Sequence, residues 1–502
     1  MQELNRKLIA DGLLSFSSLQ TTRRRWLASA LAGAGIVAHT PFASLAAGAK
    51  VSVVASTMSK VTRVKSVLEV KGTVKLKNHR GKTGEDQRSA PIEAKSTLEY
   101  EEEYRFGLEP ETAEQDSAYQ VYRIAELDNL IEKYPTKATL RESCRELVRK
   151  PISGEMATVC IDHPLTASEQ DLVESPIATM YLEQLLPTRA IQIGDSWELD
   201  SEVAAKLLNL DVITSGTIKV TLIEADETIG QLALKGKLQG EVRSAETKIA
   251  LEGKAKIDRK AGLISWVAVT FDEERAVSES EPGFKIQARL RVLREQIATI
   301  STGHTLAEMV ARLDKANTVE LVQFDSKLGA YTFVADRNWT TYSDTGVDAT
   351  LRWVKKNRVV AQCTITNMTD MEPGRQLSIG GYQNDIQKAL GKRFGQFLEA
   401  DERLSQTSLR MMRIVTIGQV ESVPVHWIHI LLSNDAGRHL ALAYSMNAAS
   451  VEAFGTNDLR MAGSFEFTLK QLPVAPEESK PDENKAVGDT KSAAKPTLIP
   501  KR

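Results

Sequence analysis

The sequence is poor in the residues that most often carry chemistry or covalent cross-links. Only 3 of its 502 residues are cysteine, 7 are histidine, and aromatic residues make up 6%. A disulfide framework would require more cysteines, and an even number of them. The 64 basic and 66 acidic side chains nearly cancel, so no excess of positive charge is present to bind nucleic acid phosphates. The composition therefore argues against a disulfide-rich scaffold and against a nucleic-acid-binding protein.

Catalytic and metal-binding motifs are also missing. The chain has no GxSxG, HExxH or paired CxxC motif and no glycine-rich dinucleotide turn. Residues 80–83 resemble the end of a phosphate loop, but Leu76 stands where that motif needs glycine. His426 and His429 are three residues apart on an expected strand and so point to opposite faces. The carboxylates of the run EYEEEY, residues 99–104, are expected to be solvated with ordinary pKa values. We expect a non-enzymatic protein without cofactor or metal ion.

The chain has no apolar run of the roughly 20 residues that cross a bilayer. Its most apolar stretch follows the arginines 23–25 and continues only to about Ala38. A charged front, a short apolar middle and a small-residue end are typical of a cleavable export signal. The order Thr-Arg-Arg-Arg-Trp-Leu resembles a twin-arginine signal with Arg23 and Arg24 as its pair, and a Sec signal stays the alternative. We expect residues 1–49 to be removed on export to the periplasm or cell envelope of a bacterium, by the twin-arginine route, which leaves no transmembrane span.

Residues 50–300 are expected to form a β-rich domain. Residues 60–77 and 96–106 alternate between apolar and polar side chains, which is typical of strands, and their lysines and glutamates can pair across the two strands. From residue 212 on, five further alternating runs are separated by short turns. This pattern predicts an antiparallel meander with one apolar face.

A helical insert is expected between these two groups of strands. Thr166 and Glu169 have the spacing of a capping box, which predicts a helix start. The helices are expected at about 166–186, with a break at Pro176, and at 201–210. These helices, or the curl of the sheet, would cover the apolar face.

A long antiparallel sheet with helices in its concave side resembles the lipoprotein carriers of the LolA type, which are half-barrels that hold acyl chains. The resemblance is in element order and alternation across residues 50–300. It implies an apolar ligand cleft lined by such residues as Leu232, Leu234, Leu251 and Trp266. The alternative is that these side chains are simply core.

The odd number of cysteines leaves their redox state open. Cys144 and Cys160 lie in strand-like runs on either side of a turn-rich segment. If the turn is centred near Ile152, the two residues face each other, and a cross-strand disulfide is geometrically plausible. A shift of one residue in register would place them on opposite faces. Cys363 alternates with polar neighbours and is expected to be a small buried hydrophobe.

A linker helix starting near Thr305 is expected within residues 301–318, followed by a second domain at 319–471. Strands, a helix around residues 381–395, an antiparallel meander and a final helix predict an α+β sandwich. The sequence is similar to the PsbP-type fold of small exported proteins, with the resemblance at residues 331–339, 423–446 and 454–465. That resemblance implies a protein-binding or accessory module.

The whole chain is thus expected to be an α+β protein. Its N-terminal part would be a long, half-barrel-like antiparallel sheet with a helical insert, and its C-terminal part a PsbP-type sandwich. Residues 472–502 are rich in Pro, Lys, Glu and Ala and are expected to be disordered. The expected function is that of an exported binding or accessory protein, whose partner is an envelope protein or a lipid-like ligand. A lipid or lipoprotein carrier is the alternative, and a hydrolase of unfamiliar type is a third possibility.

Overall fold

The structure is a computed structural model whose described residues lie between positions 60 and 469. They are residues 60–77, 87–106, 116–187, 189–278, 283–316, 319–344, 346–355 and 358–469. The expected signal segment, including Arg23 and Arg24, and the expected tail lie outside these residues. Within them, no helix has both the length and the apolar character needed to span a membrane.

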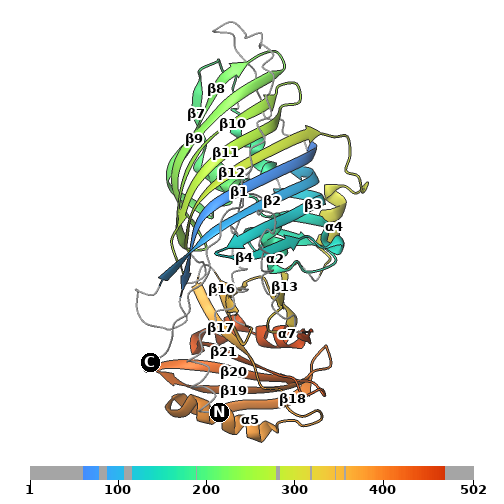
Figure 1. The fold of residues 1–502 in the computed structure, drawn as a ribbon, viewed down its shortest axis with the longest axis vertical. Helices are drawn as coiled ribbons and strands as arrows, with labels where there is room; N and C mark the ends of the chain where they lie inside the picture. The colour runs from blue at the N-terminus through green and yellow to red at the C-terminus, as the bar shows by residue number, and fades with distance from the viewer. Residues whose placement is uncertain are drawn as a thin grey trace, which may run out of the picture.

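The first part of the chain folds into one large, curved, antiparallel sheet of twelve strands (Figure 1). The strands are β1 (Lys60–Lys77), β2 (Gln87–Arg105), β3 (Ser117–Ile131), β4 (Tyr134–Thr139), β5 (Glu146–Ile152), β6 (Glu155–Cys160), β7 (Ser196–Glu198), β8 (Val212–Ala225), β9 (Ile229–Val242), β10 (Ala245–Asp258), β11 (Leu263–Arg275) and β12 (Phe284–Gln296). Their order is β6-β5-β3-β2-β1-β12-β11-β10-β9-β8-β7, and β4 pairs with β3. The expected meander of five strands is confirmed as β8 to β12.

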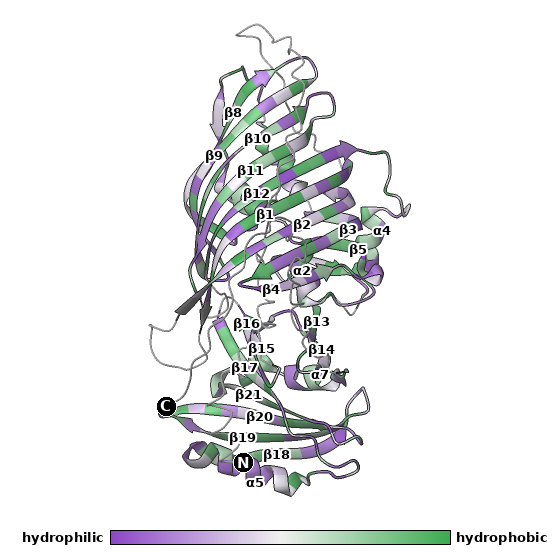
Figure 2. Cartoon of the chain, viewed as in Figure 1, coloured by the Kyte–Doolittle hydropathy of each residue, from purple (hydrophilic) through white to green (hydrophobic). Residues whose placement is uncertain are grey.

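Side-chain alternation decides which face of this sheet is buried. On β9, the residues Leu232, Leu234 and Leu238 are buried and alternate with more exposed neighbours. Figure 2 shows the same alternation of hydrophilic and hydrophobic residues along the large sheet. Because successive side chains of a strand point to opposite faces, one face becomes core and the other carries the charges.

The expected pairing of opposite charges between β1 and β2 is confirmed. Lys65 lies opposite Glu99, and their Nζ and Oε2 atoms are 3.7 Å apart. Arg63 lies opposite Glu101 with an N–O distance of 3.4 Å. Cross-strand pairs of this kind add a little stability and help to fix the register of the two strands.

Short helices cover the buried face. They are α2 (Ala167–Val173), the 3-10 helix η3 (Thr179–Leu185) and α3 (Ser201–Leu208). The capping box of Thr166 and Glu169 is confirmed at the start of α2. The expected second apolar helix exists, but it is a 3-10 helix separated from α2, because Pro176 cannot continue an α-helix. Apolar side chains of η3 and α3 belong to the same hydrophobic cluster as the inward residues of the strands.

The second part of the chain follows α4 (Leu306–Leu313), which begins after the cap Thr305 as expected. It contains the three-stranded sheet β13-β14-β22 and the seven-stranded sheet β15-β16-β17-β21-β20-β19-β18. The strands are β13 (Leu321–Ser326), β14 (Tyr331–Asp336), β15 (Trp339–Asp344), β16 (Asp348–Lys355), β17 (Arg358–Asn367), β18 (Phe394–Leu404), β19 (Arg410–Val420), β20 (Val423–Ser433), β21 (His439–Asn447) and β22 (Glu466–Phe467). The helices are α5 (Ile379–Leu390), η4 (Gly391–Arg393), η5 (Ala448–Ser450), α6 (Val451–Phe454) and α7 (Asn457–Gly463).

The seven-stranded sheet has a hydrophobic cluster on each face. Side chains of α5, including Tyr382 and Ile386, pack on one face, and Phe454 of α6 and Met461 of α7 pack on the other. The helix α5 is shorter than expected, because Gly391 ends it with a φ of 55°. The strand β18, which the sequence analysis missed, follows directly. Mostly antiparallel sheets with few helices are consistent with the expected α+β class.

Candidate functional site

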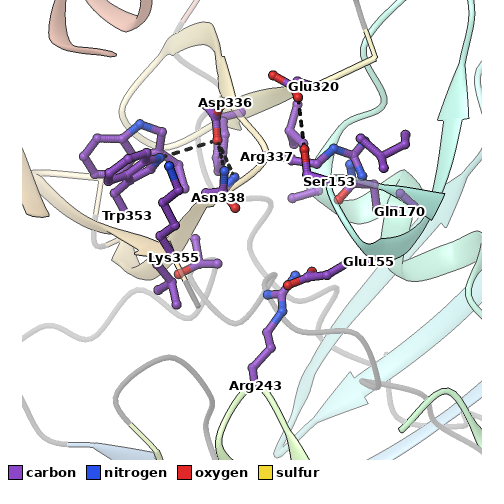
Figure 3. A pocket seen from close by; sticks show the side chains of 18 of the residues that line it. Ser153, Glu155, Gln170, Arg243, Glu320, Asp336, Arg337, Asn338, Trp353 and Lys355 are labelled. Atoms are coloured by element: carbon purple, nitrogen blue, oxygen red, sulfur yellow. Dashed lines mark hydrogen bonds between the residues drawn. The ribbon is translucent and has the colours of Figure 1, made fainter. Parts of the chain in front are cut away.

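A cavity of about 460 Å³ lies between the two parts of the chain (Figure 3). The β5–β6 hairpin and α2 form the wall from the first part, and the β9–β10 turn contributes one residue. The strands β13, β15 and β16, the β14–β15 turn and the helices α6 and α7 form the wall from the second part. Its polar and aromatic lining residues include Ser153, Glu155, Gln170, Asp171, Glu174, Arg243, Glu320, Asp336, Arg337, Asn338, Trp339, Trp353, Lys355 and Arg460.

The β14–β15 turn is held by its own hydrogen bonds. Asp336 Oδ1 accepts from the Asn338 backbone N–H at 2.8 Å and from Asn338 Nδ2 at 2.6 Å. The indole N–H of Trp353 donates to the same oxygen at 3.4 Å (Figure 3). Trp339 and Trp353 are buried and pack edge-on against Phe454. These contacts lie within the second part of the chain and hold this wall of the cavity without a ligand.

The cavity presents charges of both signs. Figure 3 shows Arg243 extending from the β9–β10 turn toward Glu155, with Lys355 on the opposite wall. The Ser153 hydroxyl donates to Glu320 Oε1 at 3.2 Å, which links the two walls. Charged and amide side chains can bind polar groups by hydrogen bonds, whereas an acyl chain offers them no donor or acceptor. The chemistry of the cavity fits a polar ligand.

A clasp next to the cavity joins the two parts of the chain; it consists of Arg141, Pro164, Leu165, Glu169 and Gln323. Arg141 donates to both carboxylate oxygens of Glu169 at 2.7 Å. It also donates to the Pro164 carbonyl at 2.8 Å and to Gln323 Oε1 of β13 at 3.1 Å. The Gln323 backbone N–H donates to the Leu165 carbonyl at 2.9 Å. One half-exposed arginine thus links β13 to the start of α2.

A second cavity of about 280 Å³ is lined in part by residues around this clasp. Arg141 and Glu169 line it from the first part, and Phe324, Phe333 and Asp344 from the second part. Burial raises the pKa of the Asp344 carboxyl, while hydrogen bonds from Gly346 and Ser326 oppose that shift. This smaller space belongs to the same contact region.

The residues expected to line an apolar cleft lie elsewhere. Leu232, Leu234 and Leu251 are at most 5% exposed and belong to one large hydrophobic cluster that includes Leu182 of η3. Trp266 does not join them. It lies opposite Lys256, whose Nζ is 5.8 Å from the centre of the indole ring, on the other face of the sheet. The expectation for Trp266 is corrected: an irregularity in the pairing of β11 with β10, between Ile264 and Trp266, breaks the alternation, so that Val267 points inward instead.

A buried ion pair, which the sequence analysis missed, anchors η3 to the sheet. Glu183 of η3 and Arg294 of β12 are 2.6 Å apart and at most 1% exposed. Glu183 also accepts from the Tyr104 hydroxyl at 2.8 Å and from the Ile264 backbone N–H at 3.1 Å. The sequence feature that could have predicted this ion pair is the single glutamate in the apolar run of η3, because a buried charge needs a partner of opposite charge.

The carboxylate of Glu102 corrects the expectation for the run EYEEEY. Glu102 is 0% exposed and accepts from Thr179 Oγ1 at 2.9 and 3.0 Å and from Gln120 Nε2 at 2.8 Å. Burial raises its pKa. The neighbouring Glu101 lies on the other face, where hydrogen bonds from Ser301 and Arg63 lower its pKa against the effect of partial burial. Alternation with Tyr100 and Tyr104 was the available signal that Glu102 faces inward.

Replacing Glu102 by glutamine is expected to remove one pH-dependent loss of stability. The pKa of Glu102 is higher in the folded state than its usual value of 4.5, so the folded state holds this proton more tightly than the unfolded state. Above pH 4.5 its contribution to the free energy of unfolding falls, by up to about 1.4 kcal/mol per pH unit, until the folded pKa is passed. Denaturant unfolding of wild type and Glu102→Gln from pH 5 to 8 measures this. A stability difference that stays constant with pH would contradict the raised pKa.

The three cysteines are buried free thiols. Cys144 ends the 3-10 helix η2 (Glu142–Cys144), not a strand, and Leu147 lies opposite Cys160. The expected register, with Cys144 facing Cys160 across a hairpin, is therefore wrong, because the turn is centred between Ser153 and Gly154. The helix η2 nevertheless brings the two thiols together. Cys363 is fully buried in the second part, and burial raises the pKa of its thiol.

The two neighbouring histidines lie on opposite faces of β20, as expected from their spacing. His426 is close to Arg413 and Asp458, on the α7 side. His429 lies between Trp427 and Leu431 in the sequence, on the face covered by α5, and its Nε2 is buried without a hydrogen-bond partner. Across the described part of the chain, no group of three or more His, Cys, Asp or Glu side chains is placed to hold a metal ion.

The chain shows weak structural similarity to several solved proteins. No family model and no curated protein match the chain. The solution structure of cyanobacterial PsbP (CyanoP) from Synechocystis is similar over 30% of this chain and 92% of its own, with 15% identity and a TM-score of 0.25. Pseudomonas aeruginosa OccK11 (OpdR) matches over 80% of this chain and 99% of its own, with 8% identity and a TM-score of 0.11. A mutant of Rh. blastica porin matches over 77% and 99%, with 8% identity and a TM-score of 0.10.

These scores are too low to carry an argument about fold or function. What they show is a weak structural similarity to PsbP over 30% of the chain. A similarity to carriers of the LolA type is not shown.

Proposed function

We propose that this chain is an exported, non-enzymatic binding protein that receives a polar ligand of the cell envelope in the cavity between its two parts. The observation that carries the proposal is the cavity itself, which both parts line with charged and amide side chains beside a packed aromatic wall. A ligand held there would contact both parts at once. Such a site is typical of binding proteins, in which ligands bind preferentially where domains meet.

The proposal includes export by the twin-arginine route, since Arg23 and Arg24 precede a short apolar run. It also includes a half-barrel-like first domain and a PsbP-type second domain that acts as an accessory module. The lipid or lipoprotein carrier is the weaker alternative. Leu232, Leu234 and Leu251, which would line its cleft, are packed against one another and against the helices of the first part.

Filling the cavity is expected to abolish ligand binding. Gln170 lies on α2 and lines the cavity, so Gln170→Trp would place an indole ring in the space where the ligand binds. The measurement is native mass spectrometry of the protein purified from the envelope fraction of its own host. We expect additional bound mass on the wild type and at least a tenfold smaller bound fraction on Gln170→Trp, because overlap with a bulky side chain excludes the ligand.

The matched control is Gln396→Trp, at an exposed position of β18 in the second part. This variant should keep the wild-type bound mass. Equal bound mass on all three proteins, or none on any of them, would rule out the cavity as the site. Bound mass in the range of an acyl lipid that persists in Gln170→Trp would favour the carrier.

A further inference from the structure

The thiols of Cys144 and Cys160 interact directly beside the clasp, although the two residues are not paired across neighbouring strands. Cys144 and Cys160 share a side-chain hydrogen bond and belong to the same hydrophobic cluster. The Cys160 thiol also donates to the Ser143 carbonyl at 3.5 Å, one residue before Cys144. A hydrogen bond between two thiols places their sulfur atoms next to each other, as disulfide formation requires. The two side chains that this bond would join are already neighbours in the structure.

The two cysteines lie on the two segments that build the clasp. Arg141, which binds Glu169 and Gln323, is the cap residue of η2 and lies three residues before Cys144. Pro164, whose carbonyl accepts from Arg141, lies four residues after Cys160. A bond between the two sulfurs would join these segments at one end of the clasp. The position of β13 and the shape of the cavity depend on the same segments.

We infer that Cys144 and Cys160 are a redox pair whose disulfide fixes the clasp between the two parts of the chain. The inference does not depend on what the cavity binds. It uses the proposed export only for the source of the oxidant, since disulfides form and persist in oxidising compartments.

The chemistry requires a partner disulfide as the oxidant. The Cys160 thiolate attacks one sulfur of that disulfide, forms a mixed disulfide and releases the other sulfur as a thiolate. The Cys144 thiolate then attacks the Cys160 sulfur and releases the second one. The pair loses two protons and two electrons, and the partner disulfide is reduced to two thiols. Cys160 is suited to the first attack, because the hydrogen bond from Cys144 lowers the pKa of its thiol.

The test is refolding of the full chain in the presence of oxidised or reduced glutathione, followed by thiol counting after denaturation. The reduced protein has three thiols, and we expect one in the oxidised protein, which is Cys363. Cys144→Ser and Cys160→Ser should each block the bond, whereas Cys363→Ser should still form it. Oxidation should raise the Tm by roughly 5–10 °C, because the bond closes a loop of moderate length in the unfolded state.

Hydrogen exchange distinguishes a fixed clasp from a merely more stable protein. The Gln323 amide, which donates to the Leu165 carbonyl, should exchange at least about tenfold more slowly in the oxidised protein than in the reduced one. Amides of the β19–β20 pair, which belongs to the separate seven-stranded sheet, should change much less. Three remaining thiols after oxidation, or equal exchange at Gln323 in both states, would overturn the inference. If Gln170→Trp does not reduce ligand binding, the proposed function fails, but the thiol counts and the exchange at Gln323 still test the disulfide.

Discussion

Replacing Glu183 by alanine is expected to lower the free energy of unfolding by about 3–5 kcal/mol, since it leaves Arg294 as an uncompensated buried charge. The carboxylate is 0% exposed and the guanidinium 1% exposed. Glu183 also accepts from Tyr104 and from the Ile264 backbone, and both donors would lose their partner. The helix η3 would then lose the only ion pair seen between it and the sheet in the described structure. Urea denaturation followed by circular dichroism measures the change.

Two controls separate the buried charge from the loss of a contact. Glu252→Ala removes an exposed ion pair with Lys235 and should change stability by no more than about 1 kcal/mol. The double variant Glu183→Leu with Arg294→Met removes both charges and should recover much of the lost stability, because apolar replacements of a buried pair are often tolerated. A cost for Glu183→Ala no larger than that for Glu252→Ala would contradict the role assigned to the pair.

The second large effect is a loss of stability in acid caused by His429. Burial lowers its pKa from 6.5 to about 4, so the folded state keeps the ring neutral while the unfolded state binds a proton. The contribution to stability is fully present above pH 6.5 and is lost as the pH falls to about 4. A shift of this size corresponds to about 3 kcal/mol. His429→Leu removes the titrating group and should flatten this part of the stability profile.

The measurement is the free energy of unfolding between pH 4 and 7 for wild type and His429→Leu. His163→Gln, at an exposed loop position after β6, serves as the control and should keep the wild-type dependence on pH. An unchanged slope in His429→Leu would show that the ring is protonated in the folded state at mild acidity. The buried, unpartnered Nε2 argues for the neutral form.

Several local features could be predicted because they depend on neighbouring residues. The alternation of Leu232, Leu234 and Leu238 predicts a half-buried strand, and its short turns predict antiparallel pairing with β10. The spacing of Thr166 and Glu169 predicts a helix start, since each side chain binds the backbone N–H of the other residue. These features follow from geometry within a few residues of chain.

Other features were not predicted from the sequence, although one of them had a local signal. In the run EYEEEY the same residue type has opposite environments, as Glu101 is near the surface and Glu102 is fully buried. Cys144 was assigned to a strand, but a turn of 3-10 helix brings it to Cys160. The unbroken alternation of β2 places Glu102 on the buried face, and a shifted turn between β5 and β6 decides the position of Cys160 relative to Cys144. Register shifts of one residue exchange the two faces of a strand, and composition does not report them.

By itself, the sequence determined the antiparallel meander, the helix caps and the alternating burial of the strands. Only the tertiary structure decided the cavity, the clasp and the Glu183–Arg294 pair. Ser153 and Glu320, which meet across the cavity, are 167 residues apart, and Glu183 and Arg294 are 111 apart. Periodicity records which way a side chain points from its own strand or helix. Which distant side chain it then meets depends on how whole sheets pack, and that is settled by the burial of all their apolar surface together.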